Sequence, residues 1–213
     1  DYTVNFSHFV SPFPNLRVLA PNIRFFAGHG VGKHFQQTNT GPGHEWSELK
    51  AYLLARLLWD PGTDPERIVD EFLDGYYGRA GRWLRRYIDA LHDALARSGA
   101  RLDIYEPPAV HAADHLSAAD VALYDRLFDK AEAAVAGDRE TLGRVRTARL
   151  PLLYAELEIA KNDLFGPRGF YEERGGRFAA RPDMVRRLET FAGRSREAGV
   201  RNLNEGGLAP EAY

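Results

Sequence analysis

The chain has 213 residues, no cysteine and a formal net charge of −2, from 28 basic and 30 acidic side chains. This length suffices for one domain or for a small and a larger one, and the composition is that of a globular protein. The lack of cysteine excludes disulfides and thiolate metal sites. The balanced charge gives no reason to expect nucleic acid or a membrane surface as a partner, and no apolar run approaches the ~18 residues of a spanning helix.

The first 60 residues alternate between expected strands and helices. Residues 1–7 read DYTVNFS, in which apolar and polar side chains alternate as in a β-strand. A short helix with Asn22 as its N-cap is expected over 21–30, a second short strand over 31–37, and a long amphipathic helix over 43–61. This order predicts a right-handed parallel strand–helix–strand unit.

Two parallel strands do not form a stable sheet alone, and nothing later in the chain offers a set of partners for them. We therefore expect residues 1–60 to be the last two strand–helix units of a TIM barrel. The remainder of that barrel would come from the parent chain. The chain also opens directly on a strand pattern without a leader, which indicates that Asp1 follows a cut inside a longer protein.

Residues 61–213 are expected to form a helical bundle domain, so the fold class is mainly α with a small parallel β/α part. Asp64 and Pro65 have the pattern of an N-cap and first helical residue. Ser117 and Asp120 are spaced as a capping box. Pro151 lies inside a long helical pattern, so a kink or two helices meeting there is expected.

Several segments together resemble one protein family, in order and over essentially the whole chain. They are DYTVNF, PFPNLRVLAPNIRFFAGHGV, HEWSELKAYLLARLLWDP, DEFLDGYYGRAG, RLPLLYAELEIAKNDLF and AGVRNLNEGG. They look like the C-terminal part of bacterial proteins classed as domain of unknown function 4838. That family is similar to α-glucuronidases and related glycoside hydrolases. The resemblance implies a TIM barrel with catalytic carboxylates, followed by a helical domain, with the first six strands outside this chain.

One position departs from the family pattern. In the second expected strand the family has Glu-Gln-Gly after a phenylalanine, whereas this chain has Gln36, Gln37 and Thr38 after Phe35. An amide cannot act as a general base or as a glycosidic nucleophile. If the position is catalytic in the family, this protein is impaired; if it only contacts sugar hydroxyls, Gln36 can still serve.

The carboxyl ends of barrel strands are where TIM-barrel enzymes carry their active sites. Here these positions are Asn5, Ser7, His8, Gln36, Gln37, Thr38 and Asn39. Their amides, hydroxyls and imidazole suit hydrogen bonding to a sugar, and Trp46 could stack on a sugar face. Asn5, His8, Gln36, Gln37 and Trp46 are therefore the predicted substrate-binding residues.

Glu45 is the acid nearest the second strand end and the one candidate for a catalytic role. Its ordinary interpretation is a helix-start acid that favours the helix dipole, and its functional interpretation is a carboxylate at the rim of the site. Glycoside hydrolysis needs two carboxyl groups. The catalytic pair is therefore expected outside this chain, which alone is not expected to be active.

No metal or cofactor is expected, because the spacing of His29, His34 and His44 fits no ligand pattern. The resemblance implies a carbohydrate substrate, and related helical domains also support a homodimer. The alternatives are a non-catalytic carbohydrate-binding protein and a helical interaction or dimerisation module. The sugar, its linkage and the compartment stay open.

Overall fold

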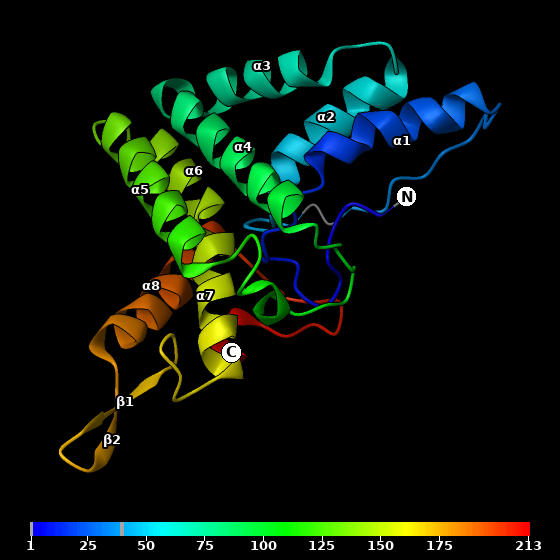
Figure 1. Cartoon of the computed structure of the whole chain (residues 1–213). Helices are drawn as coiled ribbons and strands as arrows, with labels where there is room; N and C mark the ends of the chain where they lie inside the picture. The colour runs from blue at the N-terminus through cyan, green and yellow to red at the C-terminus, as the bar shows by residue number, and fades with distance from the viewer. Residues whose placement is uncertain (1, 39–40) are drawn as a thin grey trace.

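The computed structural model describes residues 2–38 and 41–213 and is mainly helical (Figure 1). Its α-helices are α1 (Leu16–Gly28), α2 (Ser47–Trp59), α3 (Pro65–Tyr77), α4 (Gly81–Ser98), α5 (Ala118–Ala134), α6 (Arg139–Ala148), α7 (Leu150–Asn162) and α8 (Pro182–Ala198). Single turns of 3₁₀-helix lie at Gly78–Ala80, Pro108–His111 and Pro210–Ala212. The strands β1 (Tyr171–Arg174) and β2 (Arg177–Ala180) form an antiparallel hairpin.

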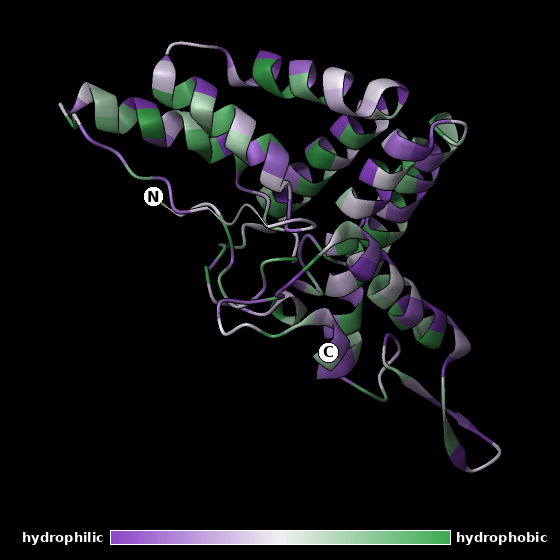
Figure 2. Ribbon diagram, turned by 180° about the vertical axis from the view of Figure 1, so that it is seen from behind, coloured by the Kyte–Doolittle hydropathy of each residue, from purple (hydrophilic) through white to green (hydrophobic). Residues whose placement is uncertain are grey.

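The helices pack as successive neighbours. Helix α1 lies along α2, α4 lies along α5, and α7 packs on α8, while the β1–β2 hairpin extends away from the helices (Figure 1). Helices such as α3 and α4 present an apolar stripe inwards and a polar face outwards, whereas α7 is buried on nearly all sides (Figure 2). The long irregular segments before α1, before α2 and after α8 meet in the middle of the molecule (Figure 1).

Two apolar clusters form most of the interior. The larger one runs through α1 to α7 and includes Leu49, Leu53, Leu84, Tyr87, Tyr124 and Phe128. The smaller one lies between α7, α8 and the C-terminal segment and includes Leu150, Leu157, Phe191, Val200 and Leu203. The segment before α2 contributes Trp46 to the larger cluster, and the segment after α8 contributes Val200 and Leu203 to the smaller one.

The local start and stop signals of the later helices are confirmed. The carboxylate of Asp64 accepts a hydrogen bond from the Glu66 N–H at 3.0 Å and caps α3. The Ser117 hydroxyl accepts from the Asp120 N–H at 3.2 Å and caps α5. Near Pro151 two helices meet, since α6 ends at Ala148 and α7 begins at Leu150.

The start of α1 differs from its prediction. The helix begins at Leu16, so Pro21 and the predicted N-cap Asn22 both lie inside it. The Leu16 N–H donates to Nε2 of His92 on α4 at 3.1 Å, and Nδ1 of His92 bonds the Ile88 carbonyl at 2.7 Å. A side chain from a distant helix therefore satisfies the first turn of α1, in place of a local cap.

The parallel sheet predicted for residues 1–60 is not formed in the described residues, whose only strands are the antiparallel β1 and β2. The two segments meet through one parallel bridge, in which the Thr3 N–H donates to the Gln37 carbonyl at 3.1 Å. Beyond this bridge the first segment bonds elsewhere. The N–H groups of Phe6 and Phe9 donate to loop carbonyls, those of Ile104 and Leu203.

A buried ion pair ties the N-terminal segment to α2. The Lys50 side chain is fully buried and Glu45 is 3% exposed. The Lys50 ammonium donates to Glu45 Oε2 at 2.5 Å and to the Thr3 carbonyl at 3.0 Å. That carbonyl also accepts from the Asn15 side-chain amide at 3.1 Å. Burial raises the pKa of the Glu45 carboxyl, while Lys50 and the Phe13 N–H favour its ionised form.

Removing one partner of this pair should strongly destabilise the protein. Lys50→Met leaves the Glu45 carboxylate buried without its counter-charge, and we expect a loss of ~3–5 kcal/mol in the free energy of unfolding. Urea unfolding followed by circular dichroism measures it. Lys33→Met, at an exposed lysine, is the control and should change stability by less than ~0.5 kcal/mol.

The double variant Glu45→Leu/Lys50→Met removes both charges and should recover part of the loss, because no unpaired charge then stays buried. A single Lys50→Met variant as stable as the unmodified chain would contradict the buried pair.

Acid should destabilise the protein through His92. Burial lowers the pKa of His92 to about 4 from 6.5. Between these values the unfolded chain binds more protons, so stability rises with pH and is lost as the pH falls from 6.5 towards 4. At 1.36 kcal/mol per pKa unit, His92 lowers the free energy of unfolding at pH 5 by about 2 kcal/mol relative to its value well above pH 6.5.

His92→Gln keeps a side-chain acceptor and does not titrate, so it should reduce the loss of unfolding free energy between pH 7 and pH 5 by about 2 kcal/mol. Ile88→Val, one turn earlier in α4, is the control and should lower stability equally at both pH values. An unchanged pH dependence in His92→Gln would contradict this role.

Candidate functional site

A cavity of about 200 Å³ lies where the start of α2 meets α3, α6 and α8. It is lined by Pro42, His44, Trp46, Glu48, Tyr76, Tyr77, Arg144, Thr147, Ala148 and Ala198. Its walls therefore combine aromatic rings with one carboxylate, one guanidinium and one imidazole. Among the predicted site residues, Trp46 is the one that lines it.

Trp46 has an unusual backbone conformation. It is the only non-glycine residue with positive φ in the described part of the chain, at φ 50° and ψ 33°. Such a conformation costs about 1–3 kcal/mol and persists only where the surroundings fix it. Here the Trp46 carbonyl accepts from the Lys50 N–H at 2.8 Å, and the buried indole packs edge-on against Tyr77 with centroids 6.2 Å apart.

The loop that leads to Trp46 passes very close to the C-terminal segment. Gly43 has φ +74°, and a Cβ there would lie 2.5 Å from Cγ2 of Val200. Next to it, His44 Nε2 lies 3.0 Å from the Asn202 carbonyl, and its ring stacks at a tilt on Phe9 with centroids 5.1 Å apart. The cavity wall is thus held by contacts to distant parts of the chain.

Glu48 is the exposed carboxylate of the cavity, and the Ser47 hydroxyl donates to its Oε2 at 2.9 Å. Burial raises the pKa of Tyr77 well above its ordinary value, and the charge of Glu48 adds to the effect, as it does for Tyr76. Burial lowers the pKa of His44, which Glu48 opposes. At neutral pH the two phenols and the imidazole are therefore uncharged groups facing one carboxylate.

Arg144 supplies the positive charge of the cavity. Its guanidinium lies 4.4 Å from the Tyr76 ring centroid, and its Nη1 donates to the Tyr76 carbonyl at 3.0 Å. It also pairs with Glu140 on its own helix. This cation–π contact fixes the Tyr76 ring as one face of the cavity. The arrangement suits a small polar ring with an apolar face and hydroxyl groups.

Asn5 and His8 lie close together, away from this lining. The Asn5 side-chain oxygen accepts from the His8 N–H at 2.9 Å, and its amide donates to the Glu106 carbonyl at 2.7 Å. Asn5 is 5% exposed, so its amide is engaged in fixing the loop around residue 106. Its structural contacts account for all its polar atoms.

His8 belongs to a polar cluster with the C-terminal part of the chain. Its Nδ1 lies 2.7 Å from the Tyr154 hydroxyl and 4.0 Å from Oε2 of Glu158. Glu158 also accepts from Lys161 at 2.9 Å and from the Tyr213 hydroxyl at 2.7 Å. Burial lowers the pKa of His8, while Glu158 opposes this, so the imidazole is neutral at neutral pH.

The other sequence candidates lie elsewhere. Gln36 Nε2 is 2.7 Å from Nε2 of His34, and Gln37 uses its main-chain carbonyl in the bridge to Thr3 while its side chain is exposed. Asn39 lies outside the described residues. Glu45 lies two residues before the start of α2 and is buried in its pair with Lys50, so its carboxylate is not exposed at a rim.

The sequence interpretation missed Glu48, Tyr76 and Arg144. Tyr76 and Tyr77 lie in the part of the chain expected to form a helical bundle, and Tyr77 is buried in the core. The signal that could have found Glu48 is its position two residues after Trp46, on the first turn of α2. No three His, Asp or Glu side chains of the described residues group as a metal site.

Comparison with known proteins gives one match. The family model described as domain of unknown function (DUF4838) matches residues 1–89. No curated protein and no solved structure matches the chain. None of the helices in the described ranges is long and apolar enough to cross a membrane. Residues 1–89, which are less than half of the 213-residue chain, are therefore similar to the DUF4838 family.

Proposed function

We propose that this chain is the carbohydrate-binding C-terminal part of an α-glucuronidase-like glycoside hydrolase, and that the cavity at Trp46 holds one sugar ring. The observation that carries the proposal is the cavity itself, in which a strained Trp46 and the Tyr76 ring stand beside Glu48 and Arg144. Aromatic faces beside a few oriented polar groups are the usual makeup of small-ligand sites.

The size of the cavity favours a small ligand. Its volume of about 200 Å³ is below the range of ~300–1,000 Å³ typical of sites for drug-sized molecules. A single sugar ring fits this volume better than an extended oligosaccharide. The Glu48 carboxylate can accept hydrogen bonds from sugar hydroxyls, and the Arg144 guanidinium can donate to ring or hydroxyl oxygens.

The cavity supports binding rather than cleavage by this chain alone. Glycoside hydrolysis uses two carboxyl groups that flank the scissile bond. Of the residues that line the cavity in the described structure, Glu48 is the one with a carboxyl group. Glu45 is buried against Lys50. Under this proposal, the catalytic carboxylates lie in the remainder of the barrel.

Exposed apolar side chains on α1, on α2 and in the segment between them support the proposal that further barrel strands pack on this chain, and two of them, Val31 and Leu58, line one hollow. Phe35 is 75% exposed and Trp59 is 92% exposed, and Phe25, Val31 and Leu58 are exposed as well. Exposed apolar groups that lie together mark interaction surfaces. The parallel bridge between Tyr2 and Gln37 lies in the same part of the chain.

A helical interaction or dimerisation module is the second candidate, and the β1–β2 hairpin favours it. Phe165 and Phe178 are 60% and 62% exposed, and their rings lie 4.6 Å apart beside Tyr171. The edge of β2 in such a hairpin can pair with another chain, whereas β1 is bonded on its outer side by the Tyr171 N–H, which donates to the Leu164 carbonyl at 2.9 Å. Sedimentation of the chain and of a Phe178→Ser variant would detect a dimer formed in this way.

Glu48 should contribute to sugar binding without contributing to the fold. Glu48→Gln keeps the shape of an exposed side chain and removes its charge, so we expect sugar affinity to fall at least about tenfold, as for a lost charge-assisted hydrogen bond of ~1.5–3 kcal/mol. The measurement is a titration with a panel of neutral and acidic monosaccharides, followed by the indole N–H signal of Trp46 in NMR spectra.

The matched control is Glu197→Gln, at an exposed residue of α8 that does not line the cavity. It should leave affinity unchanged. If no monosaccharide shifts the Trp46 signal, or if both variants weaken binding equally, the cavity is not a sugar site.

A further inference from the structure

A second, more open groove of about 420 Å³ lies between α5, α7 and α8. It is lined by Asp125, Arg149, Leu153, Asp183, Arg186, Arg187, Thr190 and Arg194. Four of these eight residues are arginines and two are aspartates, so the lining has a formal charge of +2. None of them belongs to the lining of the cavity at Trp46.

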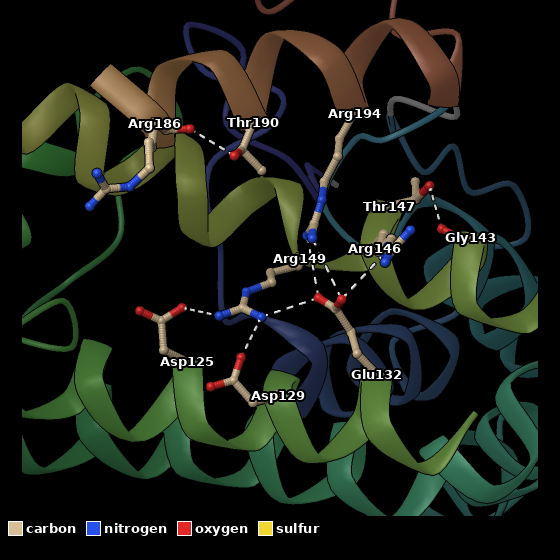
Figure 3. Close-up of polar contacts among 10 residues, drawn as sticks. All are labelled: Asp125, Asp129, Glu132, Gly143, Arg146, Thr147, Arg149, Arg186, Thr190 and Arg194. Carbon is tan, nitrogen blue, oxygen red and sulfur yellow. Dashed lines mark hydrogen bonds and ion pairs between the residues drawn. The ribbon is translucent and has the colours of Figure 1, made fainter. Parts of the chain in front are cut away.

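The acids behind the groove are shared among several arginines. The Glu132 carboxylate on α5 faces Arg149 at 3.1 Å, Arg146 at 3.3 Å and Arg194 at 3.3 Å (Figure 3). One negative charge thus serves three guanidinium groups. Arg149 also pairs with Asp125 at 2.6 Å, which engages one of the two aspartates in the lining (Figure 3).

Arg187 is incompletely satisfied. Its Nη1 pairs with Glu156, but its buried Nε has no hydrogen-bond partner among the described residues. Burial lowers the pKa of Arg187, and burial does the same for Arg194 against the opposing effect of Glu132. Both guanidinium groups therefore carry a desolvation penalty that an additional negative charge in the groove would reduce.

Arg186 is the exposed arginine at the end of the groove. No ion pair from its guanidinium is found in the described residues, and its main-chain carbonyl accepts from the Thr190 hydroxyl at 2.7 Å (Figure 3). Guanidinium groups present planar forks of donors that bind carboxylate and phosphate oxygens in pairs. Arg186, Arg187 and Arg194 line one side of the groove from a single helix.

We propose that this groove binds an oxyanion group, a carboxylate or a phosphate carried by a small molecule, through Arg186, Arg187 and Arg194. Asp125 and Arg149 offset each other, Glu156 offsets Arg187, and Glu132 is shared by three arginines. The positive charge that no ion pair of the described residues offsets is therefore that of Arg186. The site is independent of the proposed sugar cavity, because the two linings share no residue.

The test is titration of the 213-residue chain with inorganic phosphate and, separately, with succinate, two probes that contain no sugar ring. The readout is the Nε–H signals of the arginines in NMR spectra. We expect saturable shifts at Arg187 and Arg194 with at least one probe, weakening as sodium chloride is added. The two probes distinguish a phosphate from a carboxylate ligand.

Three variants locate the effect. Arg186→Ala removes an exposed, unpaired charge and should weaken binding about two- to fivefold. Arg187→Lys keeps a cation for Glu156 but lacks the fork, and should weaken binding about tenfold. Arg196→Ala is the control on the same helix, because it removes the same charge from an exposed residue outside the lining.

Binding that weakens in Arg186→Ala and is unchanged in Arg196→Ala supports the site. Equal weakening in both variants would show attraction by net charge alone and would overturn it, as would the absence of saturable shifts with both probes. Thermal unfolding checks that Arg187→Lys folds; if it does not, the comparison of Arg186→Ala with Arg196→Ala decides.

Discussion

The buried contact between Lys50 and Glu45 is the interaction on which the N-terminal part of the structure depends. Two charges removed from water are tolerated only when their geometry is satisfied. Here the ammonium also holds the Thr3 carbonyl, and the Glu45 N–H donates to the Phe9 carbonyl at 3.1 Å. Trp46 lies between the two charged residues in sequence, so the pair that fixes this segment also fixes the strained backbone of the cavity.

The same segment shows how a chain can satisfy its backbone without a sheet. Thr3, Phe6 and Phe9 each donate to a carbonyl from a different part of the chain, at Gln37, Ile104 and Leu203. These bonds replace a regular ladder. They join the beginning of the chain to the segment before α2, the loop after α4 and the C-terminal segment. The irregular segments at the centre of the molecule are therefore held together by hydrogen bonds between residues far apart in the sequence.

The sequence predicted those helix ends that are stabilised by residues nearby in the chain. The caps of α3 and α5 and the break near Pro151 follow from residues within one turn of each helix end. The start of α1 was missed because its first N–H is satisfied by His92, a residue far along the chain. Apolar and polar residues alternate in the first predicted strand, but Thr3, Val4, Asn5 and Phe6 are all buried and no strand forms at these described residues. The N–H groups of Phe6 and Phe9 bond Ile104 and Leu203, which no pattern in residues 1–37 reveals. Trp46 was predicted because it lies shortly after the second predicted strand. Arg144 was missed because it lies about 100 residues later, on α6, and only the fold brings it to the cavity.

The cavity at Trp46 is completed by residues outside the segment that matches the family. Residues 1–89 supply Trp46, Glu48 and Tyr76, whereas Arg144 comes from α6 and Ala198 from α8. Helix α8 also supplies Arg194 to the arginine-lined groove, and Arg149 of that groove lies between α6 and α7. Helix α8 therefore forms a wall of both hollows. A change in how this helix packs would alter both, which couples the family segment to the C-terminal half of the chain.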